Sequence, residues 1–67
     1  MAWFLRAHQL DDGTTECRRG VHSIDAHDTT AAAITHLLAI ARDIGNAVVF
    51  LHHVDGTVEE VARVDTT

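Results

Sequence analysis

The sequence predicts an α+β fold: a small antiparallel sheet of three to five strands with one helix packed across one face. Apolar residues recur at helical spacing in one stretch, residues 27–46, whereas the stretches on both sides alternate with a period of two, as strands do. Asp-Gly pairs at 12–13 and 55–56 are typical of hairpin turns. The expected order of elements is therefore β-β-(β)-α-β-β, in a single domain of residues 1–67.

The segment before the helix is predicted to contain a hairpin. Residues 2–10 alternate apolar and polar side chains, as one strand of a sheet does. "DDG" at 11–13 is the expected turn, and the Thr-rich stretch 14–18 is the returning strand. Gly20 ends that strand, and residues 21–25 form either a short third strand or the tail of the second.

The helix has clear start and stop signals. Asp28 or Thr29 is expected to cap its first free backbone N–H groups. Gly45 and Asn46 accept the left-handed conformation that closes a helix. The expected buried stripe consists of Ile34, Leu37, Leu38, Ala41 and Ile44.

The segment after the helix is predicted to be a second hairpin. Residues 47–54 and 57–64 are rich in β-branched side chains, and Asp55-Gly56 is expected to form a two-residue turn between them. Residues 65–67 are expected to be a frayed tail. In this register the facing pairs are His53 with Val58, His52 with Glu59, Leu51 with Glu60 and Phe50 with Val61.

Size and charge restrict the function classes. A domain of 67 residues buries only about 60% of its unfolded surface, and the single cysteine, Cys17, forms no intrachain disulfide. Self-association is then the natural source of extra stability. The net charge of −5 disfavours nucleic-acid binding, and no stretch is apolar enough to span a membrane. With one thiol and no recognisable secretory leader, a cytoplasmic location is expected.

The strands carry apolar residues on both faces, but one helix covers only one face. An uncovered apolar face usually marks an interface, so we expect a homodimer, with packing on another protein or on loops of the same chain as alternatives. The expected interface residues are Phe4, Val48, Phe50, Val54 and Val61.

Several histidines and carboxylates could form functional sites, but a structural role explains each group more simply. His52 and Glu59 could form a His-carboxylate dyad, but a cross-strand pair explains them more simply. His22, Asp25 and His27 match no strong zinc signature, and loop polarity accounts for them, although ligands combined from several chains remain an alternative. We therefore expect no catalytic residues, no metal ligands and no cofactor.

The remaining chemically active side chains are given structural roles. His36 is expected on the solvated side of the helix. Cys17 is expected to be a small buried hydrophobe in the second strand, although Arg18 and Arg19 beside it could lower the pKa of its thiol. A lone thiol is not expected to form a structural zinc site.

Three stretches, "DGTTECRRG", "DTTAAAITHLLAIARDIGN" and "VVFLHHVDGTVEE", resemble a family of short bacterial domains of unknown function. His52 falls at that family's strand-end histidine, and Asp55 and Gly56 fall at its turn. The chain departs from the family at Thr14-Thr15, where the family often carries Trp, and in being acidic rather than basic. The resemblance implies the fold and no activity.

Together these features predict a non-enzymatic cytoplasmic interaction module, a homo-oligomeric accessory or regulatory protein. The alternative is a nucleic-acid-binding protein that contacts phosphates through Arg6, Arg18 and Arg19.

Overall fold

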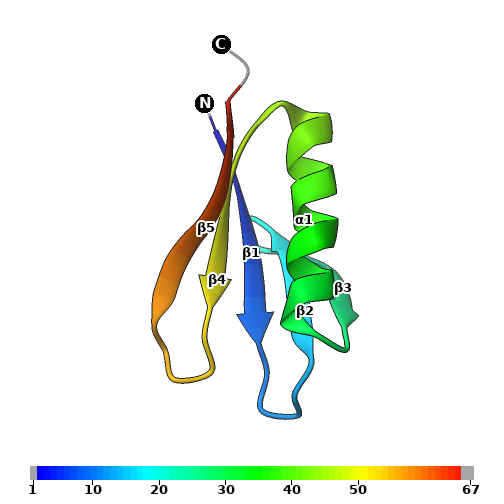
Figure 1. Ribbon diagram of the computed structural model, residues 1–67, viewed down its shortest axis with the longest axis vertical. Helices are drawn as coiled ribbons and strands as arrows, with labels where there is room; N and C mark the ends of the chain where they lie inside the picture. Colours follow the sequence, from blue (N-terminus) through cyan, green and yellow to red (C-terminus); the bar gives the residue numbers. More distant parts are fainter. Residues whose placement is uncertain (1, 66–67) are drawn as a thin grey trace.

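One five-stranded sheet and one helix make up the computed structural model, which describes residues 2–65 (Figure 1). The α+β class and the expected element order are confirmed. Asp65 is the last residue of the final strand, and positions 66 and 67 of the predicted tail lie outside the described residues. The elements are β1 (Trp3–Gln9), β2 (Thr15–Arg19), β3 (His22–His27), α1 (Thr30–Ile44), β4 (Asn46–His52) and β5 (Val58–Asp65).

The strand order is β3-β2-β1-β4-β5, and all neighbours are antiparallel except β1 and β4. The sheet is thus mixed rather than wholly antiparallel as expected. The reason is α1, which carries the chain back along the sheet so that β4 starts at the same end as β1. Both hairpin turns consequently lie at one end of the molecule (Figure 1).

The core lies between the sheet and α1. The helix contributes Ala33, Leu37 and Ala41 to it, with Ile34, Ile40 and Ile44 packed at its edge. The buried stripe is centred on Ala33, Leu37 and Ala41, so it is rotated slightly from the predicted one, and Leu38 is only half-buried. The buried residues supplied by the strands are Leu5, Ala7, Cys17, Ala47, Val49 and Leu51.

The helix ends are capped as their chemistry predicts. Thr29 is extended, and its Oγ1 accepts a hydrogen bond from the Ala32 N–H at 3.1 Å. Gly45 adopts a left-handed conformation with φ of 88°, and its N–H donates to the Ala41 carbonyl at 2.9 Å.

The predicted two-residue turn at Asp55-Gly56 is wrong. The His53 N–H donates to the Thr57 carbonyl at 2.8 Å, so the loop has three residues and Gly56 closes it with φ of 93°. This loop moves the facing pairs by one position, and Phe50 pairs with Glu60 rather than with Val61. A β-bulge after Val49 restores the expected register toward the end of β5.

Candidate metal centre

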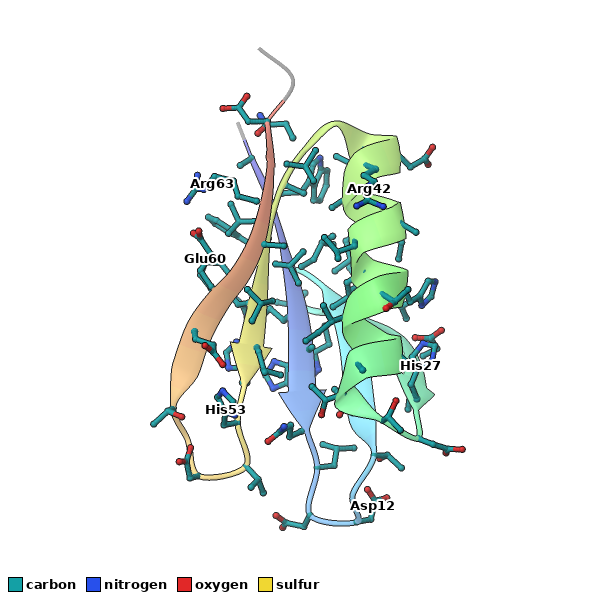
Figure 2. The ribbon with its side chains drawn as sticks, viewed as in Figure 1. Asp12, His27, Arg42, His53, Glu60 and Arg63 are labelled. Atoms are coloured by element: carbon teal, nitrogen blue, oxygen red, sulfur yellow. The ribbon has the colours of Figure 1, made fainter. Side chains whose placement is uncertain are left out.

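Four side chains of metal-ligand type meet between the sheet and the helix. Cys17 comes from β2, Asp25 and His27 come from β3, and His36 comes from α1. Their ligand atoms all lie within 4.8 Å of one another. Figure 2 shows His27 on β3 beside the helix. We call these four residues the CDHH cluster.

Strand periodicity and pairing bring the cluster together. Asp25 and His27 are two residues apart on β3, so their side chains share the face toward α1. The β2·β3 register places Cys17 directly opposite Asp25. The Cys17 thiol lies 3.5 Å from the carbonyl oxygen of Ala33, and His36 is one helical turn further along α1.

The distances within the cluster match a tetrahedral coordination shell. Nε2 of His27 lies 3.2 Å from Nδ1 of His36, and the two carboxylate oxygens of Asp25 lie 3.3 Å from the first nitrogen and 3.1 Å from the second. Zinc bonds of about 2.0–2.1 Å to nitrogen and oxygen separate neighbouring ligands by roughly 3.3 Å. The two ring nitrogens are therefore already one tetrahedron edge apart, a different oxygen of Asp25 lies at about that distance from each of them, and Cys17 Sγ completes a set of ligand atoms within 4.8 Å of one another.

Burial within the cluster is graded. Cys17 is fully buried, whereas the side chains of Asp25, His27 and His36 are 39%, 27% and 36% exposed. Oδ1 of Asp25 is itself buried and accepts no hydrogen bond from the part of the chain that the structure describes. The cluster thus combines a buried ligand oxygen with three side chains that are partly exposed to solvent.

The cysteine is not arranged for catalysis. Burial, reinforced by the negative charge of Asp25, raises the pKa of the Cys17 thiol to about 12. A reactive cysteine needs the opposite, an accessible thiol with a lowered pKa. The Cys-His-Asp combination is therefore unsuited to nucleophilic attack, but a metal ion would displace the thiol proton on binding.

From the sequence, Asp25 and His27 were considered together with His22, and loop polarity was preferred to a metal site as their explanation. His22 lies exposed outside the cluster, whereas His36, which was expected on the solvated side of the helix, lies partly buried within it. No zinc signature was visible because the ligands come from three elements. The signal that could have revealed the cluster is the spacing of two between Asp25 and His27, which places both on one face of a strand that pairs with the strand of Cys17.

The expected pairing of His52 with Glu59 does not form. Glu59 Oε1 lies 2.7 Å from Nε2 of His53, because the three-residue loop shifts the register. His52 instead stacks on His8 of β1, with ring centroids 4.0 Å apart. Burial and the positive charges of Arg6 and Arg18 contribute to lowering the pKa of both stacked histidines.

The residues expected at an interface divide among three places. Phe4, Val48 and Phe50 share the face of the sheet that α1 leaves uncovered. Val54 lies 60% exposed in the second hairpin turn, and Val61 packs against the core because it is the extra residue of the bulge. Three of the five thus share one surface.

The three arginines proposed as phosphate contacts do not share a face. Arg6 and Arg18 are neighbours on the uncovered face. Arg19 lies on the helix side, where its guanidinium sits 4.3 Å from the ring centroid of Trp3. Only two of the three arginines therefore share a face.

Within the described residues, no helix is long and apolar enough to cross a bilayer. No family model, curated protein or solved structure matches the chain.

Proposed function

We propose that this protein is a non-enzymatic metal-binding domain in which Cys17, Asp25, His27 and His36 hold one Zn²⁺ ion. The observation that carries the proposal is the convergence of four ligand groups within 4.8 Å, in which the nitrogens of His27 and His36 lie 3.2 Å apart and each lies 3.1–3.3 Å from one oxygen of Asp25. Thiolate, imidazole and carboxylate are the groups from which tetrahedral zinc sites are built. Mg²⁺ and Ca²⁺ prefer shells of oxygen ligands, so the donor set favours zinc over both.

The ion would have a structural role. None of the β3 residues is fully buried, and Ile24 is 40% exposed, so apolar packing holds this edge strand weakly. Ligands from β2, β3 and α1 around one ion would join the edge strand to the helix and to its neighbour. Four protein ligands also complete a tetrahedral shell, which leaves no position for a substrate.

The alternative is a network of hydrogen bonds that never takes up an ion. His27 and His36 can share one proton across their 3.2 Å contact, with Asp25 beside them. Both arrangements need the same side chains at nearly the same distances. Direct measurement of metal binding separates them.

The experiment is titration of the metal-free chain with Co²⁺, followed by displacement with Zn²⁺. Tetrahedral coordination with a thiolate is expected to give intense visible absorption and a sulfur-to-cobalt charge-transfer band, with one ion bound per chain in native mass spectrometry. Cys17→Ser should remove the charge-transfer band, whereas His22→Ala should leave the spectrum unchanged. A chain that binds no Co²⁺ or Zn²⁺ at micromolar concentrations would disprove the proposal.

A further inference from the structure

The face of the sheet opposite α1 has a residue pattern that complements itself. We call it the open face. It consists of three rows across the strands: Phe4, Val48 and Arg63; then Ser23, Arg18, Arg6, Phe50 and Glu60; then Ala26, Glu16, His8, His52 and Val58.

Three of the six side chains that β1 and β4 place on the open face are apolar, and the aromatic ones are only partly covered. Phe4 is 49% exposed, and its ring lies 5.8 Å from that of Phe50 on the neighbouring strand. Val48 of β4 pairs with Phe4 of β1 and is nearly fully buried. A hollow at the margin of the open face is lined by Phe4 and Arg6 from this face and by Trp3 and Val21 beside it.

The charge of the molecule is distributed unevenly. Three arginines and two glutamates give the open face a net charge of +1, so the rest of the chain, whose total is −5, carries −6. Glu16 pairs with Arg18 and Glu60 pairs with Arg63. Glu60 and Arg63 lie together on β5, on the side away from α1 (Figure 2). Because the negative charge lies outside the open face, contact through this face brings together surfaces of small net charge.

We propose that the open face binds the open face of a second copy, with a two-fold axis that runs along the strands between β1 and β4. This axis places β1 of one copy over β4 of the other and β2 over β5. Arg6 then lies over the ring of Phe50, Phe4 lies over Val48, and Arg18 lies opposite Glu60. Each contact occurs twice, as a two-fold interface requires.

The register gives these contacts directly. Arg6 is the cross-strand neighbour of Phe50, and Phe4 is the neighbour of Val48, so exchanging β1 and β4 superposes each pair on itself. Arg18 and Glu60 are in the same row, one strand outside β1 and β4 on either side. Two stacked sheets lie about 10 Å apart at a small crossing angle, a spacing at which these side chains meet.

The covered area sets the expected strength. Four strands of this length cover roughly 400 Å² of projected sheet per copy, whereas stable interfaces bury about 800 Å² of accessible surface per partner. Protruding side chains make the accessible surface larger than the projected area, but the interface remains at the small end of the range of stable interfaces. We therefore expect a reversible dimer with a dissociation constant in the micromolar range.

Single-stranded nucleic acid is the competing occupant, because exposed aromatic rings beside arginines also suit stacked bases and phosphates. The charge of −6 on the rest of the chain argues against it, because phosphate backbones are repelled by acidic surroundings. The second copy is the occupant that suits both the apolar residues of this face and the acidic remainder of the chain.

The test exchanges charges across the interface. Sedimentation equilibrium from about 1 µM to 1 mM should show a monomer–dimer equilibrium for the natural chain. Arg18→Glu and Glu60→Arg should each weaken the dimer at least tenfold, because like charges then face each other. An equimolar mixture of the two variants should form a heterodimer, since both opposing pairs regain opposite charges.

Controls separate the interface from general effects. Arg42→Glu and Asp43→Arg make the same charge changes on exposed positions of α1 and should leave dimerisation unchanged. Phe4→Ser should weaken the dimer without a charge change, and circular dichroism verifies that each variant is folded. The measurement is repeated with a metal chelator to separate dimerisation from metal binding. The CDHH cluster lies on the opposite side of the sheet, so dimerisation is expected even if the cluster binds no metal.

Three outcomes would overturn the proposal. The first is a monomer throughout the concentration range. The second is a dimer that the charge variants leave unchanged. The third is binding of a labelled oligouridine, measured by fluorescence anisotropy, that Arg6→Glu abolishes while the protein remains monomeric, which would assign the open face to nucleic acid.

Discussion

Nε2 of His27 lies 3.2 Å from Nδ1 of His36, joining the edge strand β3 to the helix α1 across nine positions of sequence. β3 supplies no residue to the buried core, so this contact and its neighbours are its main attachment to the helix. Stability of the edge strand is therefore expected to depend on polar atoms, and on any ion that they bind.

Zinc should stabilise the chain only when the histidine ligands are present. At a free Zn²⁺ concentration 100 times the dissociation constant, binding adds about 2.7 kcal/mol, which raises the Tm of so small a domain by roughly 10–20 °C. His27→Ala should abolish this increase, whereas His22→Ala, on the same strand, should retain it. Thermal melts with and without Zn²⁺ measure both, and an equal increase in both variants would contradict the assignment of the ligands.

Leu37 should be the most sensitive position of the helix. Its side chain is fully buried among the sheet residues, so Leu37→Ala should lower the free energy of unfolding by about 2–5 kcal/mol through lost burial and a cavity. Leu38→Ala provides the control. That neighbouring leucine is only half-buried, so its substitution should lower the free energy of unfolding clearly less. Urea denaturation measures both, and equal losses would show that the stripe is placed incorrectly.

The two hairpin glycines should be replaceable only at a backbone cost. Gly13 and Gly56 have φ of 90° and 93°, and a Cβ atom at either position would meet no neighbour within 4 Å. Gly56→Ala should therefore cost about 1–2 kcal/mol of stability through strain alone, and Gly56→Asn should cost less because Asn tolerates this conformation. Chemical denaturation provides the values. Equal stability of the Ala and natural chains would show that the loop relaxes.

The aspartates before these glycines should make the hairpins sensitive to acid. Asp12 and Asp55 accept hydrogen bonds from both the N–H and the hydroxyl of Thr14 and Thr57, which lowers the pKa of each carboxyl below its ordinary 3.8. A lowered pKa contributes stability that is present above pH 3.8 and is lost as the pH falls through the folded-state value.

Asp55→Ala should therefore be less stable than the natural chain at pH 7, and the difference should shrink as the pH falls below 3.8. Asp11→Ala, on an exposed residue of the first turn, is the control and should change stability little. Urea unfolding at pH 7 and at pH 3 tests this, and a difference that persists unchanged in acid would contradict it.

Local patterns were sufficient for much of the fold. The helix over 27–46 was predicted from its apolar spacing, and Thr29 and Gly45 cap it as their chemistry requires. The hairpin was predicted at the correct place, but the prediction assumed the shortest loop. The His53–Thr57 hydrogen bond closes a loop that is one residue longer than predicted. Glu59 therefore pairs with His53 instead of His52. Loop length is decided by a few backbone contacts that composition does not reveal.

The sequence alone determined which segments are strands and helix, which turns need glycine, and that one helix leaves a sheet face uncovered, because propensity and periodicity act over a few neighbouring residues. Only the tertiary structure decided the parallel pairing of β1 with β4 and the meeting of Cys17, Asp25, His27 and His36. Both depend on how α1 crosses the sheet. That path is chosen by packing of residues distant in sequence, so no local pattern records it.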